Sequence, residues 1–235
     1  MESQNLLIEK KDSVAVITLN RPHVLNILNT QAIQELNKAF HALSLEPEIQ
    51  CVVLTGTGTV FAAGADIKEM VAMNLKAAYS FARRGQQLFD FIEAMPQVVL
   101  ACVNGFALGG GCELACACDL RVLASHAKIG EPEVNLGIIP GFAGSVRLPR
   151  LIGLSSALQM VLTGEALSAP GSRPLWWVVK EAGLVTSSSE ARRMIRQGAV
   201  EVDREKVTNA DFPMVPGRGY LIQVGKRRFK RVILE

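Results

Sequence analysis

The 235-residue chain has no apolar run of the roughly 18 residues that a membrane-spanning helix requires. Residues 1–9 also lack the basic segment and the apolar stretch that together mark a secretory leader. Apolar residues still make up 49% of the chain, which is ample material for a core. The sequence therefore indicates a globular cytoplasmic protein without a membrane partner.

Histidine and cysteine are scarce, which limits metal and disulfide chemistry. The chain has three histidines, and none of them stands among the clustered cysteines at 102–118. Five cysteines are an odd number, and all precede residue 168, so they do not resemble a disulfide framework. Soft metal ligation by Cys112, Cys116 and Cys118 is one interpretation. We favour the other, that they are small core residues, and we expect no metal site.

Positive charge is scarce in the first part of the chain and concentrated in the second. Residues 1–167 contain 12 Lys and Arg against 15 Asp and Glu, whereas residues 168–235 contain 13 against 7. The net charge changes from −3 to +6, which suggests two surfaces for different partners. Glycine, serine and two prolines predict a linker at 169–174. We therefore expect one domain over 1–168 and another over 175–235.

Strand and helix patterns alternate through the first domain. A hairpin and three strands are predicted at 6–19, 51–55, 98–103 and 120–124. Thr30 is the predicted N-cap of one helix, and further helices are predicted at 76–94 and 112–118. This recurrence of strand, turn and helix indicates an α/β fold with sites at strand-to-helix turns.

The basic half has a different pattern, typical of a small α+β domain. Residues 175–182 and 188–197 predict two short helices, the second capped by Ser187 or Ser188. Residues 200–207 and 221–234 alternate as strands do.

Glycine-rich turns in the first domain favour an oxyanion. Gly109–Gly111 precede a predicted helix, so their N–H groups can approach a ligand closely. Tight helix packing alone would also explain these glycines. Ala65 offers a second N–H at another such turn, and Glu113 and Glu133 supply paired carboxyl groups. Two donors and two carboxyl groups suit acid and base chemistry on an activated carbonyl compound, such as a thioester.

These motifs resemble the enoyl-CoA hydratase, or crotonase, superfamily over residues 5–167. The resemblance implies a crotonase-like spiral of β-β-α units. It is carried by four segments in order: Leu19–Pro22, Phe61–Met70, Asn104–Leu114 and Pro132–Gly141.

The resemblance assigns a role to each motif. It implies that the N–H groups of Ala65 and Gly110 form an oxyanion hole, and that Gly141 supports the site through its backbone. Glu113 would deprotonate a water that attacks C3 of a 2-enoyl-CoA, and Glu133 would protonate C2. Because many relatives with other activities lack one of the two glutamates, retention of both favours a hydratase. No cofactor is implied beyond the coenzyme A of the substrate, and the residues implied to bind acyl-CoA are Ala63, Asp66, Ile67 and Gly109.

The chain departs from this family at two places. Glu131 replaces an expected neutral residue, and a third carboxyl group raises the pKa of its neighbours. After residues 162–167 the family continues into helices that complete the acyl-CoA pocket and support trimer packing. That helical region is absent from the sequence, so the resemblance implies a trimer-like homo-oligomer weakened by its loss.

The basic half resembles the αL RNA-binding domain shared by a small-subunit ribosomal protein and the C-terminus of bacterial tyrosyl-tRNA synthetases, over residues 174–234. The resemblance implies binding of structured RNA, such as tRNA, mostly through phosphates and shape. Asp203-Arg204 replaces the glycine-containing turn expected at the hairpin, which predicts a strained or longer turn. The residues implied to bind RNA are Arg192, Arg193, Arg196 and Lys206.

Three functional hypotheses remain open at the level of sequence. The first is a hydratase that carries an RNA-binding domain. The second is an RNA-binding protein whose crotonase-like half is an inactive scaffold, and the third is a fusion of two gene fragments without a joint function. Aminoacylation is not expected, because the nucleotide-binding signatures of a synthetase are missing. A solvated charged face, without RNA, is the simpler interpretation of the basic clusters.

Overall fold

The chain folds into two compact units, residues 1–167 and 168–235, in this computed structural model. The structure describes residues 5–168, 173–214, 219–225 and 228–233. The expected linker at 169–174 lies mostly outside the described residues. Its last two residues, Arg173–Pro174, form strand β10 and pair with β13 (Pro213–Met214). No helix among the described residues is long and apolar enough to cross a membrane.

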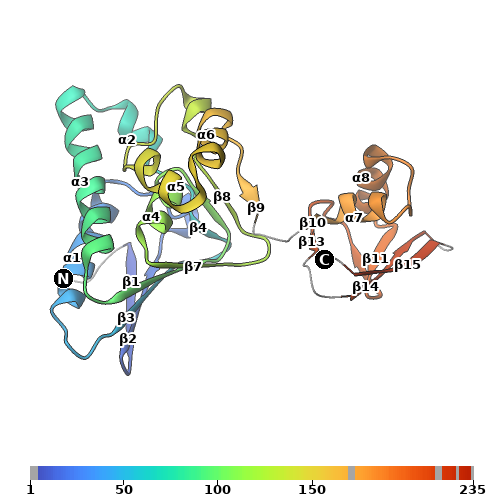
Figure 1. The fold of residues 1–235 in the computed structure, drawn as a ribbon, viewed down its shortest axis with the longest axis horizontal. Helices are drawn as coiled ribbons and strands as arrows, with labels where there is room; N and C mark the ends of the chain where they lie inside the picture. The colour runs from blue at the N-terminus through green and yellow to red at the C-terminus, as the bar shows by residue number, and fades with distance from the viewer. Residues whose placement is uncertain (1–4, 169–172, 215–218, 226–227, 234–235) are drawn as a thin grey trace. The chain divides into compact units, whose positions relative to one another are not determined.

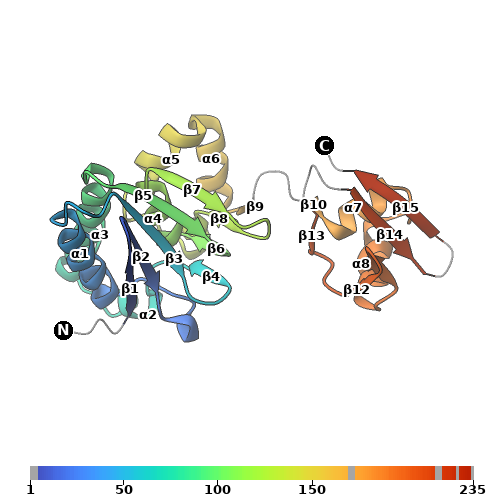
Figure 2. The ribbon, with the colours of Figure 1, turned by 90° about the horizontal axis from the view of Figure 1, so that it is seen from below.

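The N-terminal unit contains a five-stranded sheet in the order β1-β2-β3-β5-β7. The hairpin of β1 and β2 is antiparallel, and the other three pairings are parallel (Figure 2). Alternate residues of β2, β3 and β5 are buried, as expected for a sheet with one face on the core. The strands are β1 (Leu6–Lys11), β2 (Val14–Leu19), β3 (Cys51–Gly56), β5 (Val98–Val103) and β7 (Leu120–Leu123).

A second sheet receives one short strand after each of β3, β5 and β7. Its order is β4-β6-β8-β9, and its strands are β4 (Val60–Ala62), β6 (Phe106–Leu108), β8 (Lys128–Gly130) and β9 (Leu167–Ser168). Each turn of the chain thus adds one strand to each sheet before a helical segment, which is the spiral of β-β-α units expected. Because β4, β6 and β8 pair in parallel, the loops after them meet at one edge.

Helices cover the core that these sheets form. α1 and α3 lie side by side, and α5 and α6 lie next to each other after the last spiral turn (Figure 1). α1 begins after Asn29, whose side chain accepts from Ala32 N–H, so the cap lies one residue earlier than Thr30. The helical elements are η1 (Pro22–Val24), α1 (Thr30–Ser44), α2 (Ile67–Val71), α3 (Leu75–Ala94), α4 (Gly110–Ala117), η2 (Pro132–Leu136), α5 (Gly144–Ile152) and α6 (Leu154–Thr163).

The clustered cysteines are core residues. Cys112, Cys116 and Cys118 are buried in apolar clusters, and no cysteine of the described residues forms a disulfide. Burial raises the pKa of the Cys118 thiol to about 12. The Cys118 thiol therefore stays protonated at neutral pH and contributes small apolar volume to the core.

The C-terminal unit packs two helices on an antiparallel sheet in the order β12-β11-β14-β15. Ser187 caps α8, while Glu190 accepts from the Thr186 N–H in return. The expected strand over 221–234 is instead two paired strands, because the chain reverses between them. The elements are α7 (Leu175–Glu181), α8 (Ser188–Arg196), β11 (Val200–Val202), β12 (Glu205–Val207), β14 (Gly219–Val224) and β15 (Arg228–Ile233).

The turn between β11 and β12 contains only Asp203 and Arg204. Both residues have positive φ, 51° and 72°, in the left-handed region that glycine favours. Val202 pairs with Glu205, so the turn is the short two-residue kind. The Asp203 side chain accepts a hydrogen bond from the Leu221 N–H, which compensates for its unfavourable backbone conformation. Arg204 has the same kind of conformation, with φ 72°, so we assign the backbone strain of the turn to Arg204.

Replacing Arg204 with glycine should raise the free energy of unfolding of this unit by about 1 kcal/mol, because it removes a strained Cβ. Denaturant unfolding followed by tryptophan fluorescence measures this selectively, because both tryptophans, Trp176 and Trp177, lie in α7. Glu205→Gly is the control and should destabilise the unit, because it weakens a strand. An Arg204→Gly variant no more stable than the wild type would contradict the assignment of strain.

Candidate active site

Two strand-to-helix turns lie next to each other because β4 and β6 are paired neighbours. Ala65 follows β4, and Gly110 follows β6. A Cβ on Gly110 would lie 3.4 Å from the Ala65 nitrogen, so the two turns are in close contact. The juxtaposition of Ala65 and Gly110, expected from the motifs, is therefore a consequence of sheet order.

Both turns present N–H groups that form no backbone hydrogen bond in the part of the chain that the structure describes. On either side of Ala65, the Leu28 N–H donates to the Gly64 carbonyl and the Asp66 N–H donates to the Leu28 carbonyl. The Ala65 N–H takes part in neither bond. Gly110 is the first residue of α4, where N–H groups have no partner within the helix. The helix predicted at 112–118 thus begins two residues earlier, at Gly110. The positive end of its dipole lies next to the Ala65 N–H. This geometry suits an oxyanion.

The three glycines before and within α4 have separate structural reasons. Gly109 has φ 49°, and a Cβ there would lie 2.7 Å from Glu133 Oε1. A Cβ on Gly111 would lie 2.1 Å from the Ala62 carbonyl oxygen, so that glycine allows α4 to pack on β4. Gly109 therefore makes room for a carboxyl group, while Gly111 serves the packing of the helix.

Glu113 lies on α4 and is almost fully buried, with 1% of its surface exposed. Its Oε1 accepts hydrogen bonds from the Phe142 N–H at 2.8 Å and from the Gly144 N–H at 2.7 Å. Burial raises the pKa of Glu113 to about 7, although these two hydrogen bonds lower it and the charge of Glu133 raises it further. Glu113 can therefore exchange a proton near neutral pH.

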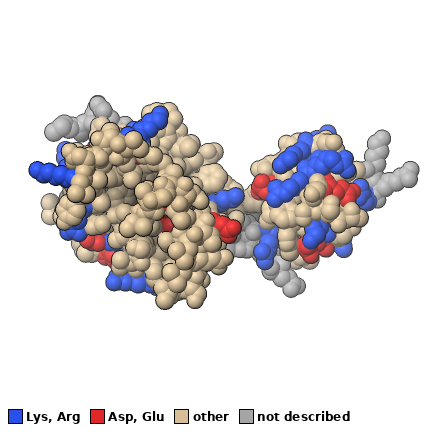
Figure 3. All heavy atoms as spheres, turned by 90° about the horizontal axis from the view of Figure 1, so that it is seen from above, with Lys and Arg blue, Asp and Glu red and all other residues tan. Residues whose placement is uncertain are grey.

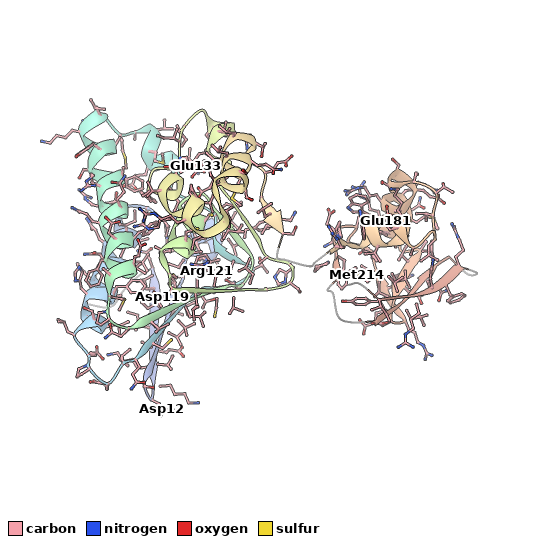
Figure 4. The ribbon with its side chains drawn as sticks, in the orientation of Figure 1. Asp12, Asp119, Arg121, Glu133, Glu181 and Met214 are labelled. Atoms are coloured by element: carbon pink, nitrogen blue, oxygen red, sulfur yellow. The ribbon has the colours of Figure 1, made fainter. Side chains whose placement is uncertain are left out.

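Glu133 lies in η2, after β8, and Figure 4 shows it beside α5 and α6, far from the β1–β2 turn at Asp12. Burial raises the pKa of Glu133, while hydrogen bonding with its own backbone N–H and with the Glu131 side chain lowers it to a lesser degree. The expectation that Glu131 raises the pKa of its neighbours is therefore wrong for Glu133. Oxygens of Glu113, Glu131 and Glu133 all lie within 4.8 Å of one another. One water molecule can therefore contact both Glu113 and Glu133, since each hydrogen bond spans about 2.8 Å.

These groups face an apolar cavity of about 180 Å³. The expected acyl-CoA residues Ala63, Ile67 and Gly109 line it, as do Ala65, Gly110, Glu113 and Glu133. Asp66 does not line it and instead caps α2, accepting from the N–H groups of Lys68 and Glu69. The cavity wall is completed by apolar side chains, among them Met70, Met73, Phe81, Leu136, Ile138 and Phe142.

The residues that hold Glu113 were not among those expected from the sequence. Gly141 lines the cavity, and its carbonyl accepts from the Gln86 side chain, but the N–H donors to Glu113 belong to Phe142 and Gly144. Support of a water by Gly141 stays a prediction.

Arg147 holds the loop that contains these donors. It is 5% exposed, donates to the Phe142 carbonyl at 3.1 Å and forms an ion pair with Glu93 of α3.

Phe142 connects this loop to α3. Its ring packs against Phe81 and Phe89, with centroids 5.3 and 5.5 Å away. A Cβ on Gly85 would lie 2.2 Å from the Phe142 ring, so a glycine in the middle of α3 leaves space for that ring. The only sequence signal for this contact is a glycine inside a helix, where it costs about 1 kcal/mol relative to alanine.

The expected RNA-binding residues lie on the surface of the C-terminal unit. Arg193, Arg196 and Lys206 are exposed, whereas Arg192 stacks 4.4 Å from the Trp176 ring centroid and pairs with Asp211 at 3.4 Å. Figure 3 shows Lys and Arg gathered over part of this unit, with Asp and Glu beside them.

Comparison with known proteins assigns both units. A family model described as enoyl-CoA hydratase/isomerase matches residues 9–194, and one described as S4 domain matches residues 177–217. The two matches overlap at 177–194, which the structure places in the C-terminal unit. The S4 match agrees with the expected small α+β domain.

Several relatives are hydratases by name. The chain is 46% identical to a crotonyl-CoA hydratase of Syntrophomonas wolfei over 170 residues, 72% of this chain and 65% of that protein. It is 40% identical to a short-chain-enoyl-CoA hydratase of Clostridium acetobutylicum over 211 residues, 89% of this chain and 78% of that protein. The chain thus spans about two thirds of the length of the Syntrophomonas protein.

Solved structures share the fold of the N-terminal unit. An enoyl-CoA hydratase from Bacillus anthracis has a TM-score of 0.69 and 38% identity, over 77% of this chain and 69% of its own. The family model covers most of the chain, the named relatives agree with it, and the spiral fold carries the matching motifs. This chain therefore belongs to the enoyl-CoA hydratase/isomerase family.

Proposed function

We propose that the N-terminal unit adds water across the double bond of a 2-enoyl-CoA thioester. One observation carries the proposal: two carboxyl groups face the same apolar cavity as two N–H groups that have no backbone partner among the described residues. The N–H groups suit the thioester oxygen, and the carboxyl groups suit a water molecule. The hydratases named among the relatives support the same chemistry.

The reaction distributes protons between the two glutamates. Ionised Glu113 takes a proton from water as the water oxygen bonds to C3. The electrons of the double bond move toward the thioester. The N–H groups of Ala65 and Gly110 stabilise the negative charge on the thioester oxygen. Protonated Glu133 then gives its proton to C2, so that the elements of one water are added.

The Glu133→Gln and Glu113→Gln variants should each lower turnover of crotonyl-CoA by about 10²- to 10⁴-fold, because each removes one proton-transfer group. The decrease in absorbance of the enoyl thioester measures the rate. Glu165→Gln, an exposed change, is the control and should match the wild type. Undiminished turnover in Glu133→Gln would exclude this role for the carboxyl group.

The value of kcat/KM should rise with pH up to about pH 7 and fall at higher pH. Glu113 acts as a base and must be ionised, and its pKa is about 7, so activity is lost as pH falls below that value. Glu133 must keep its proton, and burial raises the pKa of its carboxyl group, which favours the protonated form. Initial rates from pH 5 to 10 test this, and a flat profile between pH 5 and 8 would contradict the assignment of Glu113.

We propose further that the C-terminal unit binds structured RNA through its cationic surface. The S4 match and the net charge of +6 over residues 168–235 support this. Arg196 and Lys206 are exposed, and neither forms an ion pair with any described residue. These two side chains are thus available for phosphate, whereas Arg192 must first exchange Asp211 for the ligand.

The Arg196→Ala/Lys206→Ala double variant should bind tRNA more weakly than the wild type. Its plot of log affinity against log salt should be shallower by about 1 for each phosphate that the variant no longer neutralises. Filter binding of unfractionated tRNA between low and moderate salt measures both quantities. Arg83→Ala, an exposed change on α3, is the control and should leave both unchanged. Equal affinity and slope in the double variant would show that RNA does not bind here.

A further inference from the structure

Glu131 is a fully buried carboxyl group that the reaction above does not use. It lies between β8 and η2, with 0% of its surface exposed. Neither of its oxygens accepts a hydrogen bond from an N–H or O–H group among the described residues, and the neighbouring Cys112 thiol is only a weak donor. It does not line the cavity, although Glu113 and Glu133 do. Glu131 therefore lies behind the two reactive carboxyl groups and cannot touch the substrate.

Too little positive charge faces this group to keep it ionised. The titratable side chains around it are Glu113, Cys112 and Cys116 of α4 and Glu133 of η2. Arg147 of α5 acts on Glu113 and Cys116, and its guanidinium is already paired with Asp90 and Glu93. Three ionised carboxylates within 4.8 Å, away from water, would repel one another strongly. At least one of them must carry a proton or bind a cation.

One oxygen of Glu133 also lacks a partner. Glu133 Oε2 is buried and accepts no hydrogen bond among the described residues. This atom is an acceptor without a donor, in the same cluster as Glu131. A protonated Glu131 is neutral and has one O–H donor. It therefore removes both the repulsion among the three carboxylates and the lack of a donor to Glu133 Oε2.

We propose that Glu131 is a positioning residue that keeps its proton and donates it in a hydrogen bond to Glu133. The proposal rests on the hydratase function proposed above. When Glu133 gives its own proton to C2, the bond from Glu131 stabilises the carboxylate that forms. The proton that Glu113 took from water then passes to Glu133. This transfer restores both groups for the next reaction, while the Glu131 proton stays in place.

The electrostatics of the cluster agree with this arrangement. Burial, together with the charges of Glu113 and Glu133, raises the pKa of Glu131 to about 10, against a smaller lowering by the Cys112 thiol. In an unfolded chain the same group ionises near pH 4.5. The folded state therefore holds one more proton between these values, so stability falls as pH rises through that window. An amide at this position has no such pH dependence.

Two substitutions separate the donor from the charge. Glu131→Gln keeps a donor, and its kcat for crotonyl-CoA should stay within about threefold of the wild type. Glu131→Met fills a similar volume without a donor, and its kcat should fall by about 10- to 100-fold at unchanged KM. Glu165→Met is the matched exposed control. Wild-type kcat in Glu131→Met, or an equal loss in both variants, would overturn the proposal.

The proton itself can be observed without turnover. At pH 8, after treatment with EDTA, the wild type should show an infrared carbonyl band of a protonated carboxylic acid that Glu131→Gln lacks. The midpoint of thermal unfolding of Glu131→Gln should exceed that of the wild type by more at pH 9 than at pH 5.

These measurements decide between a proton and a cation. Identical infrared spectra, or a crotonyl-CoA turnover that requires Mg²⁺ and is lost in EDTA, would overturn the proposal. A wild type that shows the band but no crotonyl-CoA turnover would instead refute the hydratase function while leaving the protonated Glu131 in place. Because the spectra do not depend on the Met variant, they apply even where that variant does not fold.

Discussion

The burial of three carboxyl groups within 4.8 Å of one another constrains everything around the cavity. Each group needs a donor, a proton or access to water, because an isolated buried charge is costly. Glu113 receives two N–H groups from the loop before α5, and Arg147 holds that loop by its Phe142 carbonyl. The Phe142 ring in turn requires Gly85 in α3. The need of the buried Glu113 carboxyl group for donors thus constrains residues of α4, α5 and α3.

The spiral topology explains why distant motifs meet. Because β4, β6 and β8 are neighbours in one parallel sheet, the segments that follow them converge at one edge. Ala65, Gly110 and Glu133 come from these three consecutive turns. A Gly109 N–H bond to the Gly130 carbonyl, 2.8 Å long, connects two of the turns directly. The site is therefore built mainly from backbone placed by strand pairing, which suits a polarised thioester better than mobile side chains would.

Local features of the site could be predicted from the sequence, whereas features set by packing could not. Glycines before a helix and a glutamate in its first turn identify Gly110 and Glu113 as candidates, because free N–H groups at a helix start are a local feature of the backbone. The N–H groups of Phe142 and Gly144 have no side-chain signature, and their positions depend on how the loop before α5 packs on α3. The fold shows the same division. The apolar residues at 98–103 predict β5 at its observed bounds, as a buried strand. The alternation at 221–234 predicts strand but cannot show that the chain reverses into β14 and β15.

The two units combine a family that acts on acyl-CoA with an S4 domain, and each has its own core. The first of these cores is proposed to position a reactive water. The decisive experiment incubates the 235-residue chain with crotonyl-CoA in ¹⁸O-enriched water and analyses the thioester by mass spectrometry. A water that adds to the double bond yields 3-hydroxybutyryl-CoA with one solvent oxygen at C3. Recovery of unchanged crotonyl-CoA, or label only in a hydrolysed acid, would contradict it.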